Sequence, residues 1–152
     1  MTRSDAPGSD PGQTPGSDAD RYFAAGAERA EGAEPRWVEL EDVDPVAFVE
    51  GLDFKPVLGE RALVNFVSYA PNTVVPRHAH DEEQFTFVLD GEFEFECDGE
   101  TRLLRRGTVV HIPPGVPHAA RTYDSTCVQV DVFAPPRRVL VDRMLVGEEP
   151  PA

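Results

Sequence analysis

The sequence predicts an all-β fold, either a sandwich or a jelly-roll barrel, preceded by a tail. From Trp37 onward the chain consists of short runs rich in Val, Phe, Leu and Ile. Gly, Pro, Asn and Asp separate these runs about every ten residues, which is typical of β proteins. No segment has a strong helical pattern, and 152 residues, of which 40% are hydrophobic, are enough for one domain with its own core.

The individual strands follow from the same pattern. Alternation is clearest from Glu92 to Cys97, where the acidic side chains face water and Phe93 and Phe95 face inward. The pairs Asp90-Gly91 and Asp98-Gly99 predict hairpin turns. The expected strands are the nine runs 37–40, 54–58, 62–69, 84–89, 92–97, 101–104, 108–112, 118–123 and 126–133.

Composition divides the chain into three parts. Residues 1–34 are expected to form a flexible, acidic tail, because the first twenty are dominated by Gly, Pro, Ser and Asp. Within this part, Ala19 to Glu31 could form a short helix with Asp20 as its cap. We expect the folded domain to occupy residues 35–147 and a short C-terminal tail to follow over 148–152.

Charge and cysteine content exclude several classes of protein. The chain has 14 basic and 28 acidic side chains, a net charge of −14. Binding to nucleic acid or an anionic membrane requires clustered Lys and Arg, so neither partner is expected. No apolar run is long enough to span a membrane and no secretory signal is recognisable, so we expect a cytoplasmic protein. Cys97 and Cys127 stand too far apart in sequence for a thiolate zinc motif and are expected to be reduced.

Three histidines and a glutamine form the clearest candidate metal site. His78 and His80 are two residues apart, Gln84 follows four residues later, and His118 comes after a Pro- and Gly-rich turn. Side chains two apart on a strand project to one face and can hold one cation. This set of N and O ligands suits a divalent manganese, zinc, nickel or iron ion. By contrast, His111 alternates with apolar neighbours and is expected to face away from the core.

These residues resemble the two signature motifs of the cupin superfamily, whose fold is a jelly-roll barrel. The first motif reads Asn72-x5-His78-x-His80-x3-Gln84-x6-Gly91, and the second reads Gly107-x5-Pro113-x-Gly115-x2-His118-x3-Thr122. Asn72 stands where the family usually has Gly, and Asn tolerates a positive φ well. Thr122 replaces the usual Asn and is not expected to bind the metal.

The third departure, Gln84 in place of the usual Glu, affects the expected chemistry. Neutral ligands alone leave the charge of a divalent ion uncompensated, which favours polarising a substrate oxygen over losing an electron. We therefore expect Lewis-acid chemistry rather than oxygen activation. Glu82 and Glu83 lie close in sequence and could restore some negative charge, but the expectation is that both are solvated.

A narrower resemblance concerns residues 131–137, which are similar to small cupins of the pectin-degradation KdgF type. Those enzymes open the ring of unsaturated uronates. The resemblance implies that Asp131 is the general acid or base, that Phe133 packs on the substrate, and that Arg137 binds its carboxylate. Alternation along 127–133 places Cys, Gln, Asp and Phe on one face and valines on the other. The alternative is that Asp131 caps a turn and Arg137 lies on the surface.

The function expected from these residues is that of a metal-dependent isomerase or ring-opening enzyme. It would act on a small hydroxylated or keto substrate, of which a sugar acid is one example. The alternatives are a metal-dependent dioxygenase, a cupin that resembles polyketide cyclases, and a non-catalytic cupin that binds a small molecule. A homodimer is expected, because the edge run 37–40 and the apolar C-terminal residues 139–145 need cover.

Overall fold

A computed structural model describes residues 16–24 and 26–146, and the chain divides into two units, residues 1–36 and 37–152. In the first unit, helix α1 (Asp18–Tyr22) begins at a capping box in which the side chains of Ser17 and Asp20 each accept a backbone hydrogen bond. The prediction of a longer helix capped by Asp20 is therefore wrong. Residues 1–15 and 25 of the predicted tail lie outside the described residues, as does the C-terminal tail.

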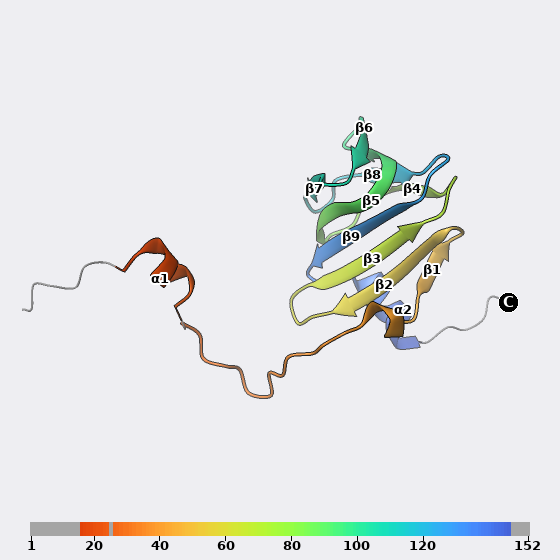
Figure 1. Ribbon diagram of the computed structural model, residues 1–152. Helices are drawn as coiled ribbons and strands as arrows, with labels where there is room; N and C mark the ends of the chain where they lie inside the picture. The colour runs from red at the N-terminus through yellow and green to blue at the C-terminus, as the bar shows by residue number, and fades with distance from the viewer. Residues whose placement is uncertain (1–15, 25, 147–152) are drawn as a thin grey trace, which may run out of the picture. The chain divides into compact units, whose positions relative to one another are not determined.

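The second unit consists mostly of antiparallel strands (Figure 1). It also has a short 3-10 helix η1 (Leu40–Asp42) and a helix α2 (Arg138–Val146). The strands are β1 (Val46–Val49), β2 (Leu52–Leu58), β3 (Leu63–Tyr69), β4 (Val74–His78), β5 (Glu83–Cys97), β6 (Glu100–Arg105), β7 (Val109–Ile112), β8 (His118–Arg121) and β9 (Cys127–Ala134). The predicted all-β class is confirmed.

The strands form a nearly closed barrel because β5 belongs to two sheets. The hydrogen-bonded order is β1-β2-β3-β9-β5-β8-β4, with β6 and β7 also paired to β5. The first half of β5 pairs with β7 and β9, and the second half pairs with β6 and β8. The larger sheet and the β4–β8 pair therefore lie on opposite sides of one interior, as the jelly-roll prediction required.

The strand β5 is continuous where the sequence predicted a hairpin. Residues 83–97 form one strand with a register shift between Val88 and Asp90. Gly91 has φ 73°, and a Cβ at this position would overlap the carbonyl oxygen of Thr126. The Asp-Gly pair thus allows the strand to leave one sheet and enter the other. The second predicted turn is correct: Asp98 and Gly99 have φ 51° and 82° and join β5 to β6.

Further elements differ from the prediction, including β4, which was not among the nine predicted runs. Residues 37–40 are not a strand: Trp37 is 93% exposed and η1 begins at Leu40. The edge of the larger sheet is instead β1, which was not predicted. The C-terminal apolar residues form α2, which buries Leu140 against Leu63 and Phe133.

The interior contains polar residues between two apolar clusters, because the inward side chains of β9 run from Cys127 through Gln129 and Asp131 to Phe133. Val67, Tyr69, Val88, Phe93 and Phe95 belong to the main core cluster. The buried polar side chains include Asn65, His80, Glu82, Gln84, Thr86, His118, Gln129 and Asp131. The cysteines, both within the described residues, are free thiols. Neither helix of the described part is long and apolar enough to cross a membrane.

Candidate metal centre and its pocket

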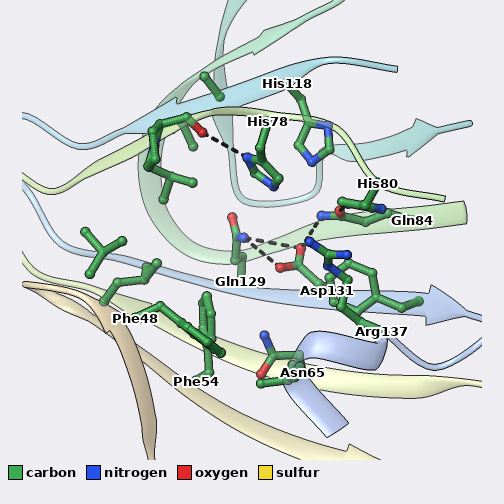
Figure 2. A pocket seen from close by; sticks show the side chains of 18 of the residues that line it. Phe48, Phe54, Asn65, His78, His80, Gln84, His118, Gln129, Asp131 and Arg137 are labelled. Atoms are coloured by element: carbon green, nitrogen blue, oxygen red, sulfur yellow. Dashed lines mark hydrogen bonds between the residues drawn. The ribbon is translucent and has the colours of Figure 1, made fainter. Parts of the chain in front are cut away.

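A cavity of about 310 Å³ lies between the two sheets and is lined by all the polar residues that the sequence selected (Figure 2). His78, His80, Gln84, His118, Asp131, Phe133 and Arg137 all contribute to its wall. This volume is at the lower end of the range for small-molecule sites, so the cavity fits one small compound.

The three histidines come together from separate elements. His78 ends β4 and His118 begins β8, and the two are paired in register. His80 lies in the connection to β5, so the prediction that His78 and His80 share one face of a strand is wrong. One ring nitrogen from each lies within 4.8 Å of the others. Nitrogens at this separation can approach one ion. The three histidines are therefore positioned for a metal site.

Backbone carbonyls fix the same ring nitrogen of each histidine. Nδ1 of His78 lies 2.9 Å from the carbonyl oxygen of Pro76, Nδ1 of His80 lies 3.0 Å from that of Glu82, and Nδ1 of His118 lies 2.9 Å from that of Val116. A carbonyl only accepts, so each Nδ1 must carry the proton. The Nε2 lone pairs are consequently left free for a ligand, an arrangement common in metal sites.

The side chain of His118 supports this interpretation most directly. Its Nε2 is buried and has no hydrogen-bond partner among the described residues. Burial, together with the neighbouring His78, His80 and Arg137, lowers the pKa of His118 to about 4, although the bond to Val116 acts in the opposite direction. A neutral imidazole with an unpaired buried nitrogen fits a metal ligand.

Gln84 presents its oxygen to the same point. Its Nε2 donates to Thr86 Oγ1 at 2.8 Å and to Asp131 Oδ1 at 3.1 Å, which fixes the orientation of the amide. Its Oε1 therefore faces Nε2 of His80 at 3.0 Å. Because Nδ1 of His80 is the protonated nitrogen, two lone pairs face each other there. A cation between them would turn this repulsion into attraction, so these residues fit a metal ion.

Asp131 faces the pocket from the centre of β9. Its carboxylate accepts hydrogen bonds from Thr86 Oγ1 at 2.7 Å, from Gln84 Nε2 and from Gln129 Nε2 at 3.2 Å. Burial raises the pKa of Asp131 to about 6, while these hydrogen bonds lower it. The carboxyl group thus lies beside a candidate metal ligand and does not cap a turn.

Phe133 and Arg137 also line the cavity, but Arg137 already has a partner. The ring of Phe133 makes an edge contact with His80 at 5.6 Å between centroids. Nη1 of Arg137 is 3.0 Å from Oε2 of Glu82, and its side chain is 25% exposed. The positive charge expected to bind a substrate carboxylate is therefore neutralised within the protein.

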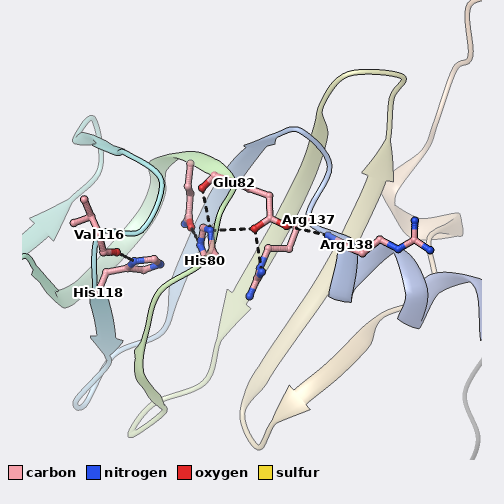
Figure 3. A network of polar contacts seen from close by, with 7 residues as sticks. His80, Glu82, Val116, His118, Arg137 and Arg138 are labelled. Atoms are coloured by element: carbon pink, nitrogen blue, oxygen red, sulfur yellow. Dashed lines mark hydrogen bonds and ion pairs between the residues drawn. The ribbon is translucent and has the colours of Figure 1, made fainter.

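Glu82 is the site residue that the sequence reasoning assigned wrongly. The side chain was expected to be solvated, but the residue is only 8% exposed. It accepts a hydrogen bond from the backbone N–H of Arg138, pairs with Arg137 and lies 3.3 Å from Nδ1 of His80 (Figure 3). Burial raises its pKa, but the backbone N–H groups of Glu82 and Arg138 and the charge of Arg137 outweigh this effect, so the pKa is lowered overall.

The two substituted motif positions, Asn72 and Thr122, and the outward-facing His111 behave as expected. Asn72 has φ 58°, in the left-handed region that its motif position requires. Thr122 is buried and hydrogen-bonds to the carbonyl of Ala70 and the N–H of Thr73, away from the histidines. His111 is exposed, stacks on Phe85 and pairs with Glu83.

Comparison with known proteins agrees with this geometry. Residues 65–133 match the family model described as a cupin domain. Dimethylsulfoniopropionate lyase DddQ from Ruegeria pomeroyi is 43% identical over 65 residues, which are 41% of this chain and 32% of that protein. Pectin degradation protein KdgF from Dickeya dadantii is 29% identical over 72 residues, 47% of this chain and 66% of that protein. The chain thus matches less than two thirds of each relative.

A solved structure shows the same fold. KdgF from a Halomonas species superposes with a TM-score of 0.66 at 24% identity, covering 70% of this chain and 99% of that one.

Proposed function

The chain carries a cupin domain, and we propose that it is an enzyme that uses one divalent metal ion to isomerise, or open the ring of, a small hydroxylated or keto compound. The observation that carries this proposal is the approach of three histidines, one ring nitrogen from each, to within 4.8 Å of one another while the Nδ1 atom of each lies at a backbone carbonyl. His78, His80, Gln84 and His118 would hold the ion. Such an ion supplies a Lewis acid that polarises a substrate oxygen.

Asp131 is proposed as the proton carrier. It is 6% exposed, faces the pocket and is hydrogen-bonded to Gln84, so a substrate near the histidines would be within reach of its carboxyl oxygens. Its Oδ1 accepts three hydrogen bonds, whereas Oδ2 accepts one weak bond from Gln129 at 3.3 Å. We propose that Oδ2 takes and returns the proton.

Phe133 and Arg137 are proposed as substrate-binding residues, as the KdgF resemblance implies. The lining of the cavity supports a contact for both. A carboxylate substrate such as a sugar acid would have to share Arg137 with Glu82, because these two are paired. A substrate without a carboxylate would leave that pair intact.

The alternatives make different predictions. A dioxygenase or a polyketide-cyclase-like cupin would use the same histidines, and the dioxygenase would in addition consume oxygen. A non-catalytic binding protein would need no ionisable group at the pocket, and the inward orientation of Asp131 favours an enzyme over it.

The test combines metal analysis with two substitutions. We expect one divalent ion per chain in the wild type, and at least about a hundredfold weaker affinity in His118→Ala. Candidate hydroxylated and keto compounds would be screened with the metal-loaded protein, with oxygen uptake recorded in parallel. Asp131→Asn should keep the metal but lose turnover by about a hundredfold or more. Unchanged turnover in Asp131→Asn, or rapid oxygen consumption with substrate, would refute the mechanism.

We also propose a homodimer, on a different surface from the one first expected. The outer face of the larger sheet is apolar over β3, β9, β5 and β7, which are paired side by side. Strand spacing gives this face a projected area of about 400 Å² on each copy, so a dimer would bury about 800 Å² in total, less than the roughly 1,200 Å² at which specific stable interfaces begin. A second copy of the same face would cover it in a weak dimer. The residues are Val64, Phe66, Phe85, Phe87, Val109, Val128, Val130 and Val132.

A further inference from the structure

The wall of the pocket on the side of β1, β2 and α2 is apolar. It is formed by Phe48, Val49, Leu52, Phe54, Val139 and Leu140. Phe48 and Phe54 contact each other with ring centroids 5.7 Å apart, and Phe48 is 47% exposed. No polar side chain from these elements lines the cavity among the described residues. A ring with hydroxyl groups on every side would leave some of them unpaired here, at about 1–3 kcal/mol each.

The side chain of Asn65 lines the same cavity next to this apolar wall. Asn65 lies on β3, lines the cavity and is 1% exposed. Its Oδ1 has no hydrogen-bond partner within the part of the chain that the structure describes. Buried amides are nearly always paired, so an unpaired one at a pocket wall indicates a ligand group that completes it.

Gln129 provides a second acceptor nearby. Its Nε2 donates to Asp131, and its buried Oε1 has no partner among the same residues. The hydroxyl of Tyr69 is close enough to Gln129 to influence the pKa of the tyrosine, so this oxygen could find a partner inside the protein. Oδ1 of Asn65 has no donor among the described residues, and its register partner Asp131 offers only acceptors, so the inference depends on Asn65.

Strand pairing sets how far the backbone at Asn65 lies from the strand that carries Gln84. It is the register partner of Asp131 on β9, which in turn pairs with Thr86 on β5. Gln84 is also on β5, so two strand spacings, about 10 Å, separate the strand of Asn65 from that of Gln84. His78 and His118 approach from the opposite β4–β8 pair (Figure 2). A single ring with a polar group at each end would span this gap.

We infer that the pocket takes a compound with an apolar, planar ring that carries a hydroxyl group at each end, one directed to the three histidines and the other to the side-chain amide of Asn65. This inference rests on the proposed function and narrows its substrate class. A neutral ring compound of this kind needs no positively charged side chain for its binding. This agrees with the pairing of Arg137 with Glu82. The polyhydroxylated ring of a sugar acid matches this wall poorly.

The test measures the binding of three ring compounds by ligand-observed NMR titration. The probes are 4-hydroxybenzyl alcohol, benzyl alcohol, which lacks one hydroxyl, and galacturonate, which has a polar ring and a carboxylate. Wild type is used with Zn²⁺ and without metal. We expect 4-hydroxybenzyl alcohol to bind about tenfold more tightly than benzyl alcohol, as one hydrogen bond provides, and galacturonate to bind most weakly.

The variant Asn65→Leu should make the two alcohols bind almost equally. Its melting temperature should not fall, because Oδ1 of Asn65 has no internal partner to lose. The matched control is Thr122→Val, where the hydroxyl makes two hydrogen bonds, so its melting temperature should fall while the binding ratio stays at tenfold.

Two results overturn the inference: galacturonate binding at least as tightly as 4-hydroxybenzyl alcohol, or a ratio that Asn65→Leu leaves unchanged. The comparison of the three probes on wild type does not depend on the variant folding. Failure of wild type to bind Zn²⁺ would instead refute the proposed function, and the metal-free titration would still test the role of Asn65.

Discussion

Glu82 connects the candidate metal centre to the C-terminal helix, and removing its charge should weaken both. Its side chain is 10% exposed and accepts from Arg137 at 3.0 Å and from the N–H of Arg138 at 3.1 Å. The variant Glu82→Gln keeps an acceptor for Arg138 but leaves the guanidinium of Arg137 without an anion.

The cost follows from the burial of the pair. Removing one partner of a fully buried ion pair costs about 3–5 kcal/mol. Arg137 keeps some contact with water, since its side chain is 25% exposed, so we expect a loss of about 2 kcal/mol in the free energy of unfolding. Glu82 also lies beside Nδ1 of His80. Loss of a carboxylate that orients a ligand should reduce Zn²⁺ affinity by about 10- to 100-fold.

The assays are urea denaturation and competition with a zinc chelator. The matched control is Glu83→Gln, one residue further along, whose partner His111 is exposed. It should cost less than about 0.5 kcal/mol and leave Zn²⁺ affinity unchanged. The double variant Glu82→Gln/Arg137→Gln should cost at least about 1 kcal/mol less than the sum of the two single variants. If Glu82→Gln matched Glu83→Gln in both assays, the reasoning would be refuted.

Three further predictions concern the frame around the site. Gly91→Ala should lower the free energy of unfolding by at least about 3 kcal/mol, because the added Cβ would meet the backbone of Thr126. Gly107 has φ 88° and open space around it, so Gly107→Ala should lower the free energy of unfolding by only about 1 kcal/mol. Equal losses for the two variants in urea denaturation would contradict this reasoning. Burial raises the pKa of the Cys127 thiol from 9.0 to about 11, so the unfolded chain ionises first and stability falls as the pH rises from 9 to 11. Cys127→Ala should reduce that fall by up to about 3 kcal/mol, and an identical pH profile would count against it. Phe87→Glu should give a monomer by light scattering while Leu103→Glu, also exposed, should not; a monomeric wild type would disprove the dimer.

The sequence was most informative where function depends on local spacing. The pair His78 and His80 and the turn before His118 have fixed separations, and the hydrogen bond from each Nδ1 is made to a carbonyl two residues away. Strand alternation likewise placed Gln129, Asp131 and Phe133 on the inner face. The spacings and the alternation are local features of the chain, so they could be read from it, although the approach of His78 to His118 depends on the pairing of β4 with β8.

Features that depend on distant contacts could not be predicted in the same way. Asp-Gly is typical of hairpins, and only the approach of Thr126 shows that Gly91 serves a bend within one strand. Asn65 gave a weak signal as a lone amide in an apolar run, but its unpaired state depends on the arrangement of neighbouring strands. Local propensity cannot specify which backbone will pass nearby.

The contacts of Glu82 also could not be predicted from the sequence, and they link the candidate metal site to α2. Among the acids 81–83 it has no distinguishing sequence pattern, and its partner Arg137 is 55 residues away. Oε2 of Glu82 faces Arg137 and His80, whereas Oε1 accepts from the first N–H of α2, the helix that brings Val139 and Leu140 to the pocket. Because one carboxylate meets both elements, a metal that orders His80 would also order α2. Hydrogen exchange in the first turn of α2 should therefore slow when Zn²⁺ binds, and Glu82→Gln should abolish that effect.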